Sequence, residues 1–165
     1  MDHAGFWRLI DDARAESNGD MDAQLAMLVR ALSAEPPDEI VAFQRLLDEH
    51  MALSYRWDLW AVAAIINGGC SDDCFDYFRA WLIMSGKTVF FDALRDPEIL
   101  VDVAGSEVAA FEPLLSAAWD AYEVRIGATI PLDMLPALEP VGVKWNDDDD
   151  LERMYLRLCA RFWTG

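Results

Sequence analysis

Four charged side chains lie close together near the middle of the chain, and their types are those that bind ligands. They are Asp72, Asp73, Asp76 and Arg79. Carboxylates offer the oxygen ligands that divalent cations take, and an arginine binds a carboxylate or phosphate through paired N–H groups. The preceding 68–69 glycine pair lets a backbone approach a bound group closely. One interpretation is therefore a small-molecule or metal-binding pocket at these four residues.

The same stretch is also typical of a buried, capped helix. Ser71 or Asp72 is a suitable N-cap, and nearly every position from 74 to 84 is apolar. The spacing of Asp72, Asp76 and Arg79 places them on one helix face. A buried arginine needs a partner, because an unpaired buried charge costs on the order of several kcal/mol. We favour this structural interpretation, with Asp76, Asp72 or a carboxylate from another helix as the partner of Arg79.

The other residues with chemical potential form no recognisable site. The chain has two histidines, His3 and His50, and three cysteines, Cys70, Cys74 and Cys159. An odd number of cysteines argues against a disulfide framework, so we interpret them as small hydrophobes. His50 is interpreted as a residue at the edge of the core, with a catalytic base as the alternative. There is no phosphate loop, nucleophile elbow or metalloprotease signature. We therefore predict no catalytic residue, no metal and no cofactor.

The net charge of the chain limits the classes of partner that it can bind. Thirteen Lys and Arg residues against thirty Asp and Glu residues give 13 − 30 = −17, which repels nucleic acid. The aspartate run 147–150 has two interpretations. It caps the helix that follows it, or it forms part of an acidic face that docks a basic protein, as a toxin immunity protein does. Capping is the simpler interpretation.

Length and composition favour one helical domain. The chain has 165 residues, of which 54% are hydrophobic. Its longest apolar run, 59–66, is too short to span a membrane, and no secretory signal opens the sequence. We expect a cytoplasmic protein without membrane contact. Asp2 and Asp20 are predicted to begin the first two helices. Apolar periodicity and caps predict an all-α, compact single-domain bundle over residues 1–165, of about seven to nine helices around a buried central helix at roughly 71–85.

Three local predictions concern the second half of the chain. We predict a helix from Ser106 that carries Val108 and Phe111, before a fresh start at Pro113. The proline-rich segment 128–143 is predicted to be an ordered loop. One final helix is predicted after the aspartate run. The apolar residues predicted to be buried in the loop are Ile130, Leu132, Met134 and Leu135, and those in the final helix are Leu151, Met154, Tyr155, Leu158 and Phe162.

The pattern as a whole resembles a bacterial family catalogued as domain of unknown function 4240. The motifs that carry the resemblance are Trp57-Asp58-Leu59-Trp60-Ala61, Gly68-Gly69-Cys70-Ser71-Asp72-Asp73 and Tyr77-Phe78-Arg79-Ala80-Trp81-Leu82-Ile83. Phe6-Trp7-Arg8-Leu9-Ile10 and Ala121-Tyr122-Glu123 extend it, so we expect it to run over the full length. The resemblance implies a helical fold and no established activity.

These observations lead to two functional hypotheses. The first is a non-catalytic protein-interaction or regulatory module, immunity-like in kind, which uses its acidic surface to bind a basic protein. The alternative is a protein that binds a small molecule or metal at Asp72, Asp73 and Arg79.

Overall fold

The computed structural model describes residues 1–132 and 138–163. Within these ranges the chain forms nine α-helices and two 3-10 helices, with no strand and one isolated bridge between Arg56 and Val141. The all-α prediction is therefore confirmed. No helix among the described residues is long and apolar enough to cross a membrane. The elements are α1 (His3–Glu16), α2 (Met21–Ala34), α3 (Pro37–Leu53), α4 (Trp57–Asn67), α5 (Asp72–Met84), α6 (Lys87–Arg95), η1 (Pro97–Asp102), η2 (Glu112–Ser116), α7 (Ala117–Ile126), α8 (Asp148–Met154) and α9 (Leu156–Phe162).

Aspartate caps begin the first two helices. The Asp2 carboxylate accepts the Gly5 N–H at 2.8 Å, and the Asp20 carboxylate accepts the Ala23 N–H at 3.0 Å. Each bond satisfies a backbone donor that the first helical turn leaves free. Between the two helices the chain turns at Asn18, whose φ of 52° is left-handed. The sequence predicted both starts because caps act within a few residues.

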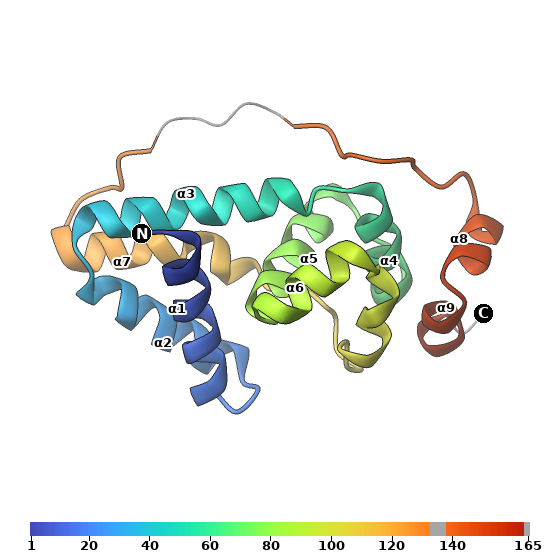
Figure 1. Cartoon of the computed structure of the whole chain (residues 1–165), viewed down its shortest axis with the longest axis horizontal. Coiled ribbons are helices and arrows are strands. Elements are labelled where there is room, and N and C mark those ends of the chain that lie inside the picture. Colours follow the sequence, from blue (N-terminus) through green and yellow to red (C-terminus); the bar gives the residue numbers. More distant parts are fainter. Residues whose placement is uncertain (133–137, 164–165) are drawn as a thin grey trace.

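Helix α5 is the central helix. The Ser71 hydroxyl accepts the Cys74 N–H at 3.3 Å, so Ser71 is the cap. Most residues of α5 are buried, and the helix contacts α1, α3, α4, α6 and η2. Figure 1 shows α5 between two groups of helices. Because its neighbours come from both groups, α5 joins them.

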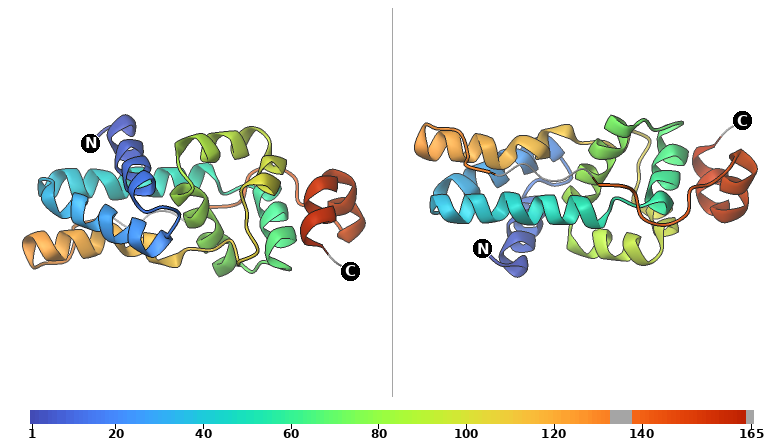
Figure 2. Two further views of the ribbon diagram at one scale, coloured as in Figure 1. Left: turned by 90° about the horizontal axis from the view of Figure 1, so that it is seen from below. Right: turned by 90° about the horizontal axis from the view of Figure 1, so that it is seen from above.

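The two groups differ in which helices pack together. Helix α7 packs along α2 and α3, and α1 packs against α2. On the other side of α5, α6 packs against η1, and α9 packs against α4 and η1. Figures 1 and 2 show α8 and α9 at the end of the molecule opposite α7. The apolar side chains of both groups belong to one buried cluster.

The helix predicted from Ser106 is wrong. Residues 104–111 are irregular, and helical structure resumes only at η2, one residue before Pro113. Tertiary bonds hold the end of this segment. The Phe111 N–H donates to the Tyr77 carbonyl at 2.8 Å, and the Asn67 side-chain amide bonds both main-chain groups of Ala109. These contacts satisfy backbone groups that a helix would have paired internally.

The final helix is divided in two. Its cap is Asp147, which accepts the Asp150 N–H at 3.0 Å, so the capping interpretation of the aspartate run is confirmed. Tyr155 separates α8 from α9 with a non-helical conformation, φ −132° and ψ 57°. Its side chain is buried, whereas Met154 is 55% exposed and was wrongly predicted to face inward. In the proline-rich segment Ile130 is buried, and the predicted burial of positions 134 and 135 lies outside the described residues.

Candidate functional site

Arg79 points into the interior. It is 7% exposed, and its Nη1 donates to the Met51 carbonyl at 2.5 Å while Nη2 pairs with the Asp76 carboxylate. Its guanidinium carbon lies 4.6 Å from the ring centroid of Tyr55 and 5.1 Å from that of Phe75. The Met51 carbonyl is one of those that the end of a helix leaves without an intrahelical partner. Arg79 therefore ties α5 to the end of α3.

Of the four predicted site residues, the structure brings two together. Asp76 and Arg79 form an ion pair, whereas Asp72 and Asp73 are exposed in the first turn of α5. Burial lowers the pKa of Arg79, and the Asp76 carboxylate opposes that shift. The expected ion pair is thus present with Asp76 as the partner. A ligand at these four residues stays a prediction.

Neither a cluster of metal ligands nor a reactive thiol is evident in the described part of the chain. No group of three His, Cys, Asp or Glu side chains is placed there to hold a metal ion. All three cysteines are free thiols; Cys159 is buried, while Cys70 and Cys74 are only half-buried. Burial raises the pKa of the Cys70 thiol, and its neighbour Cys74 raises it further. A raised pKa disfavours the reactive thiolate.

His50 lies deeper than the sequence indicated. It is 2% exposed, so its placement at the core edge was wrong. Its Nδ1 lies 2.7 Å from the Leu46 carbonyl, and its Nε2 accepts the Trp7 indole N–H at 3.2 Å. Its ring stacks on Phe6 with 4.7 Å between centroids. Both ring nitrogens are therefore used inside the core, which holds the neutral imidazole with its proton on Nδ1.

This environment predicts a pH effect on stability. Burial lowers the pKa of His50 below its ordinary 6.5, with an opposing contribution from the Leu46 carbonyl. The unfolded chain then binds more protons than the folded one as pH falls through 6.5. The free energy of unfolding should therefore decrease by roughly 1 kcal/mol between about pH 7.5 and about pH 5.5. Urea unfolding at several pH values measures it.

The matched controls are two histidine substitutions. His50→Gln should remove most of the pH dependence in this window, whereas His3→Gln should leave most of it, because burial is the main cause of the lowered pKa of His50. Equal slopes for wild type and His50→Gln would contradict the assignment.

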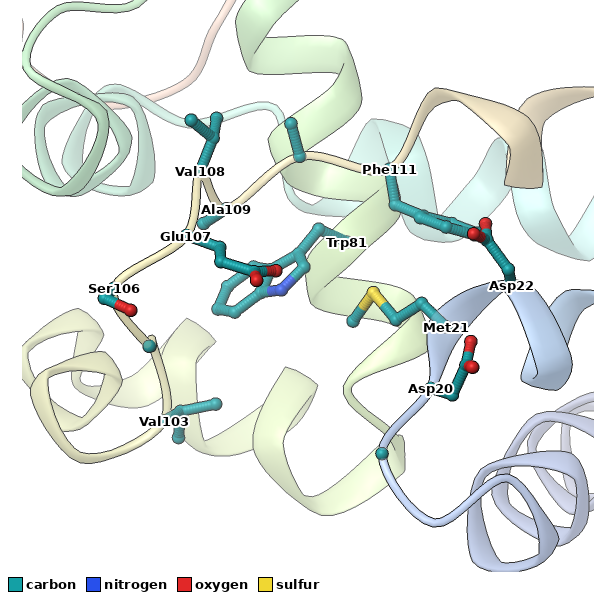
Figure 3. A pocket seen from close by; sticks show the side chains of 13 residues that line it. Asp20, Met21, Asp22, Trp81, Val103, Ser106, Glu107, Val108, Ala109 and Phe111 are labelled. Carbon is teal, nitrogen blue, oxygen red and sulfur yellow. The ribbon is translucent and has the colours of Figure 1, made fainter.

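A groove opens beside α5. It has a volume of about 610 Å³ and lies between the start of α2, helix α5 and the irregular segment 103–111 (Figure 3). Its apolar side includes Trp81 and Phe111, each 8% exposed, and the half-buried Met21. We call it the acidic groove. Its lining residues are Gly19, Asp20, Met21, Asp22, Trp81, Val103, Gly105, Ser106, Glu107, Val108, Ala109, Ala110 and Phe111.

Three carboxylates surround this apolar floor. Asp20 and Asp22 lie on the α2 side, and Glu107 lies on the facing segment, with Trp81 between them (Figure 3). All three are exposed, and none forms an ion pair with another described residue. Several negative charges around an apolar surface of low dielectric constant concentrate negative potential. The groove is therefore suited to a cation that also has apolar surface.

Sequence reasoning missed this groove. Asp20 was recognised only as a cap, Trp81 as a core residue and Phe111 as part of a helix. The groove joins residues about eighty positions apart, and no local period links them. One signal in the sequence could have indicated the irregular segment. Gly105 and Pro113 interrupt the helical pattern around Ser106, which is typical of an irregular segment.

The comparison with known proteins identifies the family. The chain belongs to the family described as "Protein of unknown function (DUF4240)", whose sequence model matches residues 1–124. The matched range contains α5 and the whole acidic groove, but not α8 or α9. The resemblance is thus confirmed over this range rather than over the full length. No curated protein matches the chain. No solved structure matches it either.

Proposed function

We propose that this protein is a non-catalytic binding protein that takes a cationic segment of a partner protein into the acidic groove. The observation that carries the proposal is the set of three carboxylates, Asp20, Asp22 and Glu107, arranged around an aromatic floor. None of the three forms an ion pair with another described residue, although Asp20 also caps α2. A net charge of −17 adds long-range attraction for a basic partner. Electrostatic complementarity of this kind favours rapid encounter and selects against acidic partners.

The apolar floor lets the groove bind apolar surface as well as positive charge. A Lys or Arg side chain carries an apolar stem below its charged head. The stem can cover Phe111 and Met21 while the head approaches a carboxylate or the face of Trp81. Apolar and acidic residues both line the groove. This combination supports recognition of a basic side chain over recognition of a simple inorganic cation.

The aspartate run at 147–150 is a weaker candidate for the same role. Asp147 is used as a helix cap, and Asp150 accepts two bonds from Asn146 and pairs with Arg153. Asp148 and Asp149 are exposed. No apolar floor accompanies them among the lining residues of the described cavities. We therefore place the partner at the groove. We also propose a cytoplasmic location, which the three free thiols support.

Calorimetric titration with a basic probe tests the proposal. The probe is an acetylated, amidated octapeptide of alternating lysine and alanine. The pair Asp22→Asn and Glu107→Gln should weaken its binding about tenfold, because each removes one charge from the groove. The matched pair Asp148→Asn and Asp149→Asn removes the same charge from the aspartate run and should change the affinity by less than about twofold. Equal losses in both double variants would reduce the binding to non-specific attraction and overturn the proposal.

A further inference from the structure

Resting on the proposed function, we infer that the groove's occupant is an extended peptide segment whose main chain hydrogen-bonds to the groove, and not a free polyamine. Both classes of ligand satisfy the carboxylates. Two features of the groove are used only by a peptide. One is the indole N–H of Trp81, and the other is the set of free backbone N–H groups at residues 106–108.

Trp81 holds an unused donor. Trp81 is only 8% exposed, and its indole N–H forms no hydrogen bond with another described residue. The Nε1 atom itself is not fully buried, so the N–H is accessible from the groove that Trp81 lines. Two other tryptophans with little exposure are satisfied. The Trp7 N–H donates to His50 at 3.2 Å, and the Trp60 N–H donates to the Cys70 carbonyl at 3.0 Å. A largely buried indole normally has such a partner. Trp81 therefore offers a donor to a ligand acceptor such as a peptide carbonyl.

The segment opposite α2 holds unused backbone groups. The N–H groups of Ser106, Glu107 and Val108 bond to no other described residue, although all three residues line the groove. The next part of the segment is fixed, because Ala109 and Phe111 are bonded to other elements. Residues 106–108 form no strand, so they offer individual N–H donors to the carbonyls of a ligand beside a fixed stretch of chain.

The positions of the charges agree with a chain that crosses the groove. Figure 3 shows Trp81 between the two aspartates of α2 and Glu107. An extended peptide has carbonyls that point in alternate directions and side chains on alternate faces, so it can supply acceptors for the free N–H groups and basic side chains for both acidic sides. A polyamine has no acceptor for the indole N–H, because protonated amines only donate. A peptide can therefore accept the indole hydrogen bond in the groove, whereas a polyamine cannot.

Two probes of equal charge separate the classes: the lysine–alanine octapeptide and spermine, each carrying four positive charges. We expect the peptide to bind at least about tenfold more tightly than spermine. Trp81→Phe keeps an aromatic ring and removes the donor. It should weaken peptide binding about fivefold and change spermine binding by less than about twofold. Trp119→Phe is the matched control, because Trp119 is 41% exposed and lies outside the groove.

The spectrum of the wild-type protein gives a readout that does not depend on a variant. On titration with the peptide, the assigned indole N–H resonance of Trp81 should move downfield, and spermine should not move it. Equal affinities for the two probes, or an unmoved Trp81 resonance, would overturn the peptide inference while leaving the proposed function standing. If neither probe binds, or if the groove carboxylates do not affect binding, the proposed function fails as well.

Discussion

Replacing Arg79 with alanine is expected to lower the free energy of unfolding by about 3 kcal/mol. The change removes the donor to the Met51 carbonyl, the ion pair with Asp76 and the ring contacts with Tyr55 and Phe75. It also leaves an unfilled volume where α5 meets α3. A long side chain that is 7% exposed cannot be replaced by water without loss of packing.

Urea unfolding followed by circular dichroism measures this loss, and Arg95→Ala is its matched control. Arg95 also pairs with an aspartate three residues earlier, Asp92, but its side chain is 76% exposed. The control should therefore cost less than about 0.5 kcal/mol. Asp76→Asn should fall between the two, because the Asp76 side chain is 49% exposed. Equal costs for the two arginine variants would contradict the structural role of Arg79.

Reversing the charge at Asp22 and Glu107 to lysine is expected to weaken binding of the lysine–alanine octapeptide about 100-fold. Two attractive contacts become repulsive, so the effect is larger than that of neutral substitutions. The same double variant should gain affinity for the corresponding glutamate–alanine octapeptide, which the wild-type protein should not bind measurably. Calorimetric titration of both peptides with both proteins completes the comparison.

The control is a reversal of equal size elsewhere. Asp148→Lys and Asp149→Lys change the net charge by the same amount, in a region without groove-lining residues. Only a several-fold loss is expected there, and it should vanish in high salt, where exposed charges are screened. A loss as large as that of the groove variant would show that net charge, and not the groove, governs binding.

The parts of the fold that the sequence predicted are those specified locally. The caps at Asp2, Asp20 and Ser71 each act on a backbone group within three residues. Helix α5 could be recognised as central because an almost wholly apolar helix must be buried on all sides. Asp76, the partner of Arg79 in the structure, was one of the candidates that the sequence offered, because residues three positions apart share a helix face. Asp72 and a carboxylate from another helix were the others.

The parts that the sequence did not predict depend on distant contacts. Residues 104–111 have enough apolar residues to suggest a helix, but bonds to Asn67 and Tyr77 hold the end of the segment in an irregular path. That path forms one side of the acidic groove, so the error about Ser106 and the missed groove have the same cause. His50 was placed at the core edge because α3 alone does not show that Phe6 and Trp7 cover it.

The most direct test of the central claim is to map where the lysine–alanine octapeptide binds, from backbone amide shifts in the nuclear magnetic resonance spectrum of the labelled protein. Binding at the acidic groove predicts that the largest shifts fall at the start of α2, around Trp81 and in residues 105–110. Small shifts are expected at Asp148 and Asp149. Largest shifts at the aspartate run, or weak shifts spread over all acidic residues, would contradict the assignment of the groove as the binding site.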